Sequence, residues 1–440
     1  MREGSINVAI VGGGITGLAL AVGLVARNIS VRVYERARNF HEIGAGIGFT
    51  SNAEKAMMVV DPSVQAAFKR VATRNTSDWF QWVDGYNEDG EDARHTKETL
   101  LFEMYLGERG FEGCRRSEFL AELIKTIPPG VVAFQKGLHR IVDRGEGETL
   151  LLAFCDGTTA EADVVIGCDG IHSRVRQFVL GEDNPASYPN YSHKFAVRGL
   201  IPMERAKAVV GQAKTSTRLM HLGTDAHLLT FPVALGSLLN VVAFVTDSDE
   251  WPHTDRMTSK GTKAEVASAF ASFGPTARAI IDLLPDEVEK WAVFDTYDHP
   301  ATAYTRGRIC ISGDAAHAAA PHHGAGAGFG IEDAAALCVL IADASSLIHQ
   351  SCSNREDILR TAFATYDFIR RDRTQWLVQS SRLVGEMYEW QNPQTPCNSD
   401  NFRREVKWRS RAIWDYDVEA MVHDAREAFL KTLCNRAVRD

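Results

Sequence analysis

The beginning of the chain combines an apolar strand, a glycine-rich turn and an apolar helix. Residues 6–11 (INVAIV) are mostly apolar and rich in branched side chains, as in a buried parallel strand, and they lead directly into Gly12-x-Gly14-x-x-Gly17. An Ala-rich apolar segment follows and predicts a helix from Leu18 to about Arg27. In such a unit Gly12 permits the tight turn, Gly14 lets a pyrophosphate approach the positive helix end, and Gly17 lets the helix pack close to the strand.

A second apolar strand follows this helix and ends at an acid. Residues 31–34 (VRVY) precede Glu35, whose carboxylate can accept hydrogen bonds from ribose hydroxyls. A glycine fingerprint alone also fits an ordinary glycine turn. Because strand, helix, second strand and terminal acid occur in register, the sequence favours a dinucleotide-binding unit.

Composition limits the remaining classes. The chain has 440 residues, enough for two or three domain-sized units, and 48 basic against 57 acidic residues give a net charge of −9, which does not favour binding to nucleic acid or anionic membranes. The longest apolar stretch, 334–348, contains Asp343 and is too short to cross a bilayer. The eight cysteines show no paired short spacing, so we expect reduced thiols. With no targeting segment visible, we expect a cytoplasmic protein.

The predicted organisation is interleaved. Strand-like alternation appears at 138–155 and again at 194–245. A long helix is predicted from about Ile331, and the tail is also helical in pattern. We predict an α/β fold in which a Rossmann-like domain is interleaved with a β-sheet substrate domain and followed by a helical C-terminal segment. The expected boundaries are 1–75, 110–190 and 291–355 for the nucleotide-binding domain, 76–109 and 191–290 for the sheet domain, and 356–440 for the helical segment.

Two later segments carry a family resemblance. DVVIGCDGIHSRVR at 163–176 resembles the Asp-Gly motif of the single-component FAD-dependent aromatic hydroxylases, the salicylate-hydroxylase-like flavin monooxygenases, and GDAAHAAAPHHGAGAG at 313–328 resembles their Gly-Asp motif. The resemblance extends over most of residues 5–375. Within this family the chain is most similar to fungal polyketide hydroxylases that dearomatise resorcinol-type rings in azaphilone and tropolone biosynthesis.

The resemblance implies non-covalently bound FAD and assigns its contacts. Asp169 would close a turn near the flavin, Asp314 would hold the ribityl chain, and Arg116 would lie on the cofactor. Gly46 belongs to a glycine-rich loop, EIGAGIGFTSNA, at 42–53. The full set of expected FAD contacts is Gly12, Gly14, Gly17, Glu35, Gly46, Arg116, Asp169, Asp314, Pro321, Gly324, Gly326 and Ala327.

The implied reaction is hydroxylation of a phenol. Only one glycine fingerprint is present, so NADPH or NADH would visit the flavin transiently as co-substrate, and Glu35, serving FAD, does not discriminate between them. Oxygen would add at the flavin C4a position, and the resulting hydroperoxide would attack an electron-rich carbon of a phenolic polyketide. No metal is required for this chemistry, and the oligomeric state is left open.

Arg198 is the expected substrate anchor. It lies in the strand-like segment HKFAVRGL among Phe195, Val197 and Leu200, where an arginine is costly unless it is paired or serves a ligand. The alternative is a strand-edge arginine neutralised by a surface acid. The resemblance favours a role in binding the phenolate.

Tyr105 is a second candidate for the substrate site. In some dearomatising relatives a tyrosine stands where this chain has Phe231. Because phenylalanine has no hydroxyl, this chain lacks one group that would donate a hydrogen bond to the phenolate. We hypothesise that Tyr105, in the segment FEMYLGERGF, supplies a replacement hydroxyl. The alternative is that Tyr105 only packs beneath a loop.

Other conspicuous residues have simpler interpretations. His322 and His323 are adjacent, so their side chains diverge and a role in a loop beside the flavin is favoured over metal ligation. Ser173 has no triad context, and Arg176 fits a structural or nucleotide-facing charge. The alternatives to the dearomatising hydroxylase are a salicylate-type ring hydroxylase, a flavin oxidase or dehydrogenase, an epoxidase, and a non-catalytic flavin-binding regulator.

Overall fold

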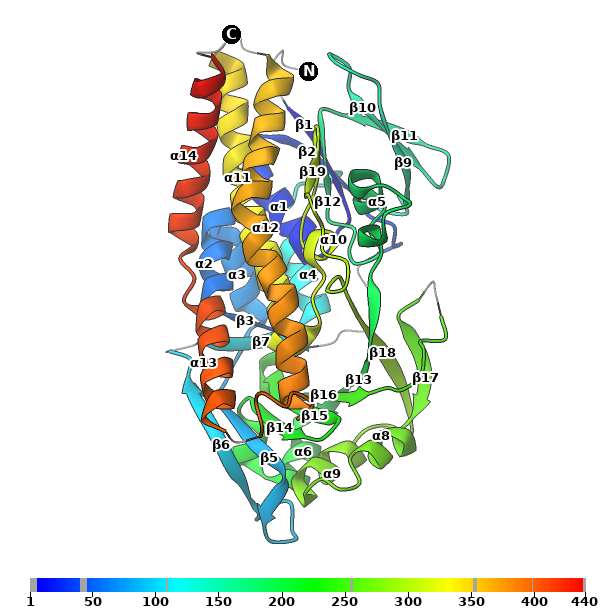
Figure 1. Ribbon diagram of the computed structural model, residues 1–440, viewed down its shortest axis with the longest axis vertical. Helices are drawn as coiled ribbons and strands as arrows, with labels where there is room; N and C mark the ends of the chain where they lie inside the picture. The colour runs from blue at the N-terminus through cyan, green and yellow to red at the C-terminus, as the bar shows by residue number, and fades with distance from the viewer. Residues whose placement is uncertain are drawn as a thin grey trace.

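The computed structural model describes residues 6–39, 46–107, 110–253, 256–350, 354–397 and 399–437. Two large sheets occupy opposite ends of the long axis, and long helices run along one side of the molecule (Figure 1). These helices are α11 (Gly326–Gln350), α12 (Arg355–Tyr388), α13 (Asp400–Trp414) and α14 (Val418–Ala437). The fold class predicted from the sequence, an α/β protein with a nucleotide-binding domain, a sheet domain and C-terminal helices, is confirmed.

The first large sheet contains the predicted glycine fingerprint. Its six strands follow the order β19-β20-β12-β1-β2-β8, and β1 pairs in parallel with both β2 and β12. Helix α1 (Ile15–Ala26) begins three residues earlier than the sequence pattern indicated, immediately after the glycine turn. The strands are β1 (Asn7–Val11), β2 (Ser30–Tyr34), β8 (Val132–Ala133), β12 (Val164–Gly167), β19 (Thr305–Arg306) and β20 (Ile309–Ile311).

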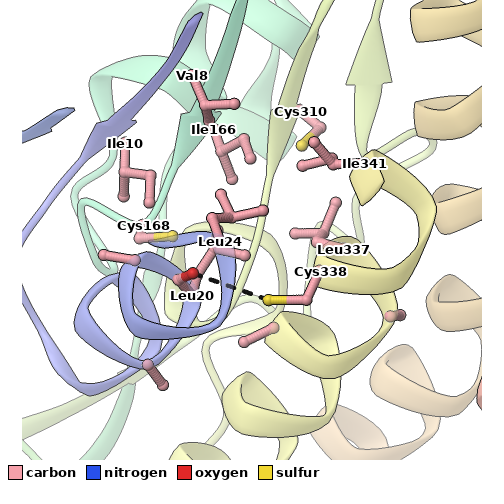
Figure 2. Close-up of a cluster of buried hydrophobic side chains, with 14 of the residues drawn as sticks. Val8, Ile10, Leu20, Leu24, Ile166, Cys168, Cys310, Leu337, Cys338 and Ile341 are labelled. Carbon is pink, nitrogen blue, oxygen red and sulfur yellow. Dashed lines mark hydrogen bonds between the residues drawn. The ribbon is translucent and has the colours of Figure 1, made fainter. Parts of the chain in front are cut away.

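Apolar side chains from distant parts of the chain hold this domain together. Figure 2 shows Val8 and Ile166 of the sheet facing Leu24 of α1 and Leu337 of α11. The Cys338 thiol on α11 donates to the carbonyl oxygen of Leu20 with an S···O distance of 3.8 Å. Helix α11 therefore completes the core of a domain whose first strand lies more than three hundred residues earlier in the sequence.

The second large sheet has eight strands in the order β17-β18-β13-β16-β15-β14-β5-β6. Neighbouring strands pair antiparallel, except for β14 and β5, which are parallel. The strands are β5 (Trp79–Asp89), β6 (Lys97–Tyr105), β13 (Asn190–Pro202), β14 (Leu219–Gly223), β15 (Ala226–Val233), β16 (Leu238–Thr246), β17 (Thr258–Thr262) and β18 (Glu287–Asp295).

The two faces of this sheet have different partners. One face, including Val197 and Val241, packs against α6 (Met203–Val210), α8 (Lys263–Ala269) and α9 (Pro275–Asp282). The opposite face, including Trp82 and Met220, packs against side chains of α11, α12 and α13. Side chains alternate along a strand, so the two faces carry different residues. Helix α11 also belongs to the nucleotide-binding domain, and this second face is therefore the one that meets the nucleotide-binding half.

Short elements join the two halves. A three-stranded sheet is formed by β3 (Gly46–Thr50), β7 (Phe111–Arg115) and β4 (Thr73–Arg74), and helix α4 (Arg116–Ile124) follows β7 directly. Another hairpin-rich sheet is formed by β9 (Leu138–Asp143), β10 (Leu150–Phe154) and β11 (Thr159–Ala162). The remaining helices near the nucleotide-binding sheet are α2 (Ser51–Val60), α3 (Pro62–Val71), α5 (Arg174–Leu180) and the single turn α10 (Asp314–His317). Among the helices described, none is long and apolar enough to cross a membrane.

Candidate active site

The glycine fingerprint has the close contacts that its spacing predicts. A Cβ atom at Gly12 would lie 2.2 Å from the carbonyl oxygen of Cys168, and Gly12 has a φ of +103°. A Cβ atom at Gly17 would lie 2.1 Å from the carbonyl oxygen of Gly12. At Gly14, by contrast, the nearest atom to such a Cβ is Nη2 of Arg116 at 3.8 Å. Gly12 and Gly17 thus allow close packing, whereas Gly14 borders open space at the N-terminus of α1, where a phosphate binds favourably.

Glu35 immediately follows β2 and faces this turn. Its Oε2 accepts the backbone N–H of Gly13 at 2.6 Å, and its Oε1 accepts the N–H of Ala37 at 2.7 Å. The carboxylate is therefore fixed beside the fingerprint, and its remaining lone pairs are available to ribose hydroxyls.

Asp169 supports the fold of the site through backbone contacts. Its Oδ2 accepts the backbone N–H groups of Arg174 and Val175 at 2.8 and 3.2 Å, which caps the start of α5. Ser173 accepts the backbone N–H of Arg176 at 2.8 Å, so its hydroxyl is a helix cap. Asp169 thus shapes the turn that abuts Gly12.

Arg176 has a structural role that the sequence left open. It is fully buried and donates to the carbonyl oxygens of Ala186, Ala315 and Ala316 at 2.6 to 3.0 Å. These bonds tie α5 to α10, the turn that begins with Asp314.

Asp314 and the following loop lie next to the fingerprint. A Cβ atom at Gly313, which has a φ of +60°, would lie 2.7 Å from Oγ1 of Thr16. The Asp314 side chain is solvent-accessible, yet burial raises its pKa, opposed by the charges of His317 and Arg116. Such an accessible carboxylate deep within the protein is suited to a polar ligand.

The glycine-rich loop after Asp314 borders the same space. A Cβ atom at Gly326 would lie 3.8 Å from Oδ1 of Asp314, while one at Gly324 would have no neighbour within 4 Å among the described residues. Pro321 begins a short 3-10 turn that ends at His323, and Gly324 has a φ of +64°. Helix α11 starts at Gly326, five residues before the predicted start, and Ala327 is its second residue.

Behind this loop lies a buried ionic network that the sequence did not predict. Asp333 accepts the backbone N–H of Gly313 at 2.9 Å and lies 2.6 Å from Nε2 of His317. Burial alone would raise the pKa of Asp333, but His317 and Arg370 outweigh it and lower the pKa. Glu332 pairs with Arg370 at 2.8 Å and with Arg373 at 2.9 Å. An Ile-Glu-Asp sequence inside an apolar helix is the signal that could have predicted these buried acids.

Arg116 begins α4 and connects several predicted contacts. Burial lowers its pKa, while the charges of Asp314 and Glu35 raise it. Arg116 therefore lies near both acids as well as near Gly14. Arg115, the residue before it, pairs with Glu118 at 3.3 Å instead.

Gly46 reaches the second sheet. Its backbone N–H donates to Oδ1 of Asn240 at 3.0 Å, while Nδ2 of Asn240 is buried without a partner among the described residues. Asn240 also lines a cavity of about 810 Å³, together with Arg198, Leu200 and Trp291. The residues preceding Gly46 in this loop, 42–45, lie outside the described part of the chain.

Arg198 lies in the middle of the sheet, on the face toward the nucleotide-binding half. Strand β13 is flanked by β16 and β18, so Arg198 is not the edge residue that the alternative interpretation required. Its guanidinium lies 5.2 Å from the centre of the Trp291 ring. Burial lowers the pKa of Arg198, and the nearby charge of Arg116 lowers it further. No described carboxylate pairs with Arg198, and the side chain faces the cavity.

Apolar groups surround this cation. Strand register places Arg198 beside Val242, and Val242 beside Leu229, on one face of the sheet. Phe231, two residues further along β15, is buried and makes an edge-to-face contact with Phe111 at 5.4 Å. The neighbours of Arg198 along this face of the sheet are thus apolar, while the β17–β18 side of the cavity adds the charged side chains of Arg256, Lys260, Glu287 and Glu289.

The structure does not bring Tyr105 to this site. Trp82 pairs with Phe102 on the face that Arg198 shares, whereas Tyr105, three residues further along β6, points to the opposite face. It is exposed and contacts Trp79 at 5.5 Å. Strand β6 is also five strands from β13, about 24 Å at the usual strand spacing. The structure therefore places Tyr105 away from Phe231 and Arg198, and this position does not support Tyr105 as the replacement for the missing hydroxyl.

The adjacent histidines diverge, as expected from their spacing. His322 is buried, with its ring 5.2 Å from that of His227, and Nε2 of His323 lies 2.9 Å from Oγ of Ser380. In the part of the chain that the structure describes, no group of three or more His, Cys, Asp or Glu side chains could hold a metal ion.

A further buried group of charges lies behind His227. Its Nδ1 is 3.0 Å from Oε1 of Glu389, and Glu389 also pairs with Lys194. Burial alone would raise the pKa of Glu389, but His227 and Lys194 hold it at about 2. This group anchors the end of α12 to the sheet.

Taken together, these residues fit FAD. Among the described residues, there is open space at Gly14 and Gly324, and Asp314 provides an accessible acid. Asn240 adds an amide nitrogen, Nδ2, without a described partner. The fold and site define a dinucleotide-binding protein with a second sheet suited to an aromatic ligand.

Comparison with known proteins agrees with this description. Residues 132–350 match the family model "FAD binding domain", and residues 9–172 match "FAD-NAD(P)-binding". The chain is 61% identical to FAD-dependent monooxygenase orf3 and 59% identical to FAD-dependent monooxygenase azaH, both of Aspergillus niger, over 98% of each chain. A salicylate hydroxylase solved as a substrate complex has a TM-score of 0.82 and 29% identity, covering 96% of this chain and 98% of that one.

The chain belongs to the FAD-dependent monooxygenases. The predictions of a flavoprotein enzyme, of FAD as cofactor and of a salicylate-hydroxylase-like fold are confirmed.

Proposed function

We propose that this enzyme uses NADPH or NADH and O₂ to hydroxylate a phenolic, resorcinol-type polyketide, with loss of the ring's aromaticity. The observation that carries the proposal is Arg198, a cation without a described carboxylate partner on the cavity-lining face of the substrate sheet. An arginine held in this way supplies the positive, hydrogen-bonding group that a phenolate oxygen requires.

The chemistry follows from the charge and polarity of the site. Arg198 stabilises the ionised phenol, and ionisation increases the electron density of the ring carbon that is attacked. Leu229 and Val242 exclude water from the same face, which strengthens the interaction of Arg198 with the phenolate. Bound FAD, reduced by the nicotinamide co-substrate, supplies the activated oxygen atom.

The residues proposed to hold FAD come from both ends of the nucleotide-binding half. Gly14 leaves room for the pyrophosphate, Glu35 accepts from the ribose, and Asp314 accepts from the ribityl chain, with Arg116 between them. Asp169 would act through the turn that it caps. The other proposed contacts are Gly12, Gly17, Gly46, Pro321, Gly324, Gly326 and Ala327.

The substrate class is supported by the relatives. A protein named salicylate hydroxylase asL1, of Sarocladium schorii, is 42% identical over 97% of this chain. Salicylate is a phenol, so an anchor for a phenolate oxygen is consistent with this relationship. Dearomatisation and the resorcinol-type ring rest on the resemblance to fungal polyketide hydroxylases.

The test is product formation by the purified enzyme and an Arg198 variant. We expect the wild type to consume NADPH or NADH in the presence of alkylated resorcinol aldehydes and to yield products heavier by one oxygen, without aromatic absorbance. Arg198→Ala should reduce kcat/KM by about tenfold to a hundredfold, because a charged hydrogen bond is lost, while FAD content is retained.

Arg205→Ala is the matched control, because Arg205 is an exposed arginine of α6, on the other side of the sheet. Near-normal turnover by Arg198→Ala would contradict the anchor. Oxidised products without added oxygen would indicate an oxidase or dehydrogenase, and a product that keeps its aromatic absorbance would indicate simple ring hydroxylation.

A further inference from the structure

Arg218 is a second arginine without a counter-charge among the described residues, and unlike Arg198, whose side chain is solvent-accessible in the cavity, it is buried. It directly precedes β14, its exposed fraction is 4%, and it has no hydrogen bond or ion pair with any residue that the structure describes. Burial lowers its pKa to about 10, so the guanidinium remains charged at neutral pH. A buried cation that is neither paired nor hydrogen-bonded is strongly unfavourable.

The other buried arginines that the structure describes have carbonyl or carboxylate partners. Arg176 donates to three backbone carbonyls, and Arg370 pairs with Glu332 and Asp333. Arg218 differs because its described contacts are with aromatic rings. A hydrogen-bond acceptor would offset the energetic cost of burying this guanidinium, and the described residues do not provide one.

The described neighbours of the Arg218 guanidinium are two aromatic rings. Its guanidinium carbon lies 3.7 Å from the centre of the Phe80 ring and 4.5 Å from that of Phe111. Cation–π contacts of this kind occupy the faces of the planar group. The N–H groups point outward in the plane, so Arg218 remains able to donate to an acceptor at its edge.

Arg218 and Arg198 lie on the same face of the substrate sheet. Arg198 is in register with Val242, Leu229 and Met220 on successive strands, and Arg218 is two residues from Met220. Its contact with Phe80, which like Trp82 packs in the cluster on this face, agrees with that placement. Three strand intervals separate β13 from β14, about 14 Å.

The apolar face of the sheet between the two arginines adjoins the proposed flavin loop. Phe111 contacts both Arg218 and Phe231. Arg218 is also near enough to His323, in the turn that begins at Pro321, for its charge to contribute to lowering the pKa of that histidine. Arg218 thus lies at the far end of the same apolar face from Arg198.

We propose that Arg218 is a second substrate anchor, which binds a carbonyl or carboxylate oxygen on a side chain of the ring whose phenolate Arg198 binds. The inference rests on the proposed function, since it assumes a phenolic ligand at Arg198. It specifies the substrate class further: a ring with an oxygenated side chain long enough to reach β14. Arg218 would fix the orientation of the ring and hence which ring carbon is hydroxylated.

The test compares ligands that differ only in this second oxygen. The probes are resorcinols whose linear side chain carries a ketone at the second, fourth or sixth carbon, each matched with the analogue in which the ketone is a methylene. Binding is followed by the change in flavin absorbance, which does not require turnover. At one chain length we expect the wild type to bind the ketone at least about tenfold more tightly than the methylene analogue.

The variants are Arg218→Met, which keeps an unbranched side chain between the two rings, and Arg218→Lys, which keeps the charge but lacks the planar fork. In Arg218→Met the ketone-to-methylene affinity ratio should fall to about one, and Arg218→Lys should retain part of it. Arg205→Met, on the other face, should keep the wild-type ratio. Thermal unfolding and FAD content identify any variant that fails to fold, and the wild-type ratio remains decisive in that case.

Two results would overturn the second anchor. One is a wild-type ratio near one at every chain length, and the other is an unchanged ratio in a folded Arg218→Met enzyme. Both leave the proposed hydroxylation intact if oxygenated products still form. A ratio that depends on Arg218 without any oxygenated product would support the anchor and contradict the proposed reaction instead.

Discussion

The backbone N–H of Gly46 donates to Oδ1 of Asn240 at 3.0 Å and thereby joins β3 to strand β16 of the substrate sheet. A Cβ atom at Gly46 would lie 2.5 Å from Oδ1 of Asn240, so the two residues leave no room for a larger side chain at Gly46. The position of the start of β3 therefore depends on the substrate sheet.

We predict that Gly46→Ala weakens FAD binding more than Asn240→Ala does. Gly46→Ala clashes with Asn240 and displaces the start of β3, whereas Asn240→Ala costs about 1–3 kcal/mol by leaving one N–H unpaired. The double variant should bind FAD better than Gly46→Ala alone, because the clash is relieved. Titration of the apoprotein with FAD measures all three, and strictly additive losses would contradict the contact.

Gly14→Val should yield a protein that purifies without FAD. Among the described residues, only Arg116 comes within 4 Å of the position that a Cβ atom at Gly14 would take, and a branched side chain would fill the space assigned to the pyrophosphate. The ratio of flavin absorbance to protein absorbance gives the result. Gly137→Ala is the control, because a Cβ atom there would meet its neighbours at 3.7 Å without strain. Full FAD loading of Gly14→Val would show that the pyrophosphate lies elsewhere.

The stability of the protein should decrease as the pH falls below 6.5. Burial, together with Arg409 and Arg218, lowers the pKa of His323 from 6.5 to about 3. The unfolded chain therefore takes up a proton below pH 6.5 that the folded chain does not, so this contribution is complete above 6.5 and is lost on acidification. For His323 alone the loss is about 2 kcal/mol at about pH 5.

His323→Gln should flatten this pH dependence in denaturant unfolding measured at about pH 7.5 and about pH 5. His423→Gln, at an exposed position on α14, should leave it unchanged. His227 and His322, whose pKa values are also lowered first by burial, contribute in the same direction and account for the remaining slope. An identical slope in His323→Gln and the wild type would contradict the assignment.

Tyr105→Phe should change neither the rate nor the enantiomeric ratio of the product. The hydroxyl lies on the opposite face of the sheet from Arg198, at an exposed strand end. Chiral chromatography of the product checks this expectation. A lower enantiomeric ratio in Tyr105→Phe would show that the loop after β6 reaches the substrate.

The sequence predicted most of the fold because its motifs are local. The glycine fingerprint, Glu35 and the Gly-Asp turn each depend on a few neighbouring residues, and all of them lie where the pattern indicated. Arg198 could be selected because a cation in an apolar strand is conspicuous in any sequence. The starts of α1 and α11 were placed too late because glycines, which disfavour helix interiors, occupy their first turns.

The missed features depend on contacts between distant segments. Arg370 resembles any arginine in a polar helix until it meets Glu332 and Asp333, and Arg218 becomes unusual only when its burial is known. The position of Tyr105 could not be predicted for a similar reason. Its side-chain direction depends on the register of β5 and β6 and on the order of eight strands, neither of which a single sequence specifies.

The ionic contacts of Asp333 also set an order of events during biosynthesis. The turn at Gly313 is held by Asp333 on α11, and Asp333 is in turn held by Arg370 on α12. Until the chain has been synthesised through Arg373, Glu332 and Asp333 lack their arginine partners on α12. The turn that leads to Asp314 then lacks the support of this network. We therefore expect the chain to bind FAD tightly only after α12 has docked. Flavin binding would then be a late step in maturation.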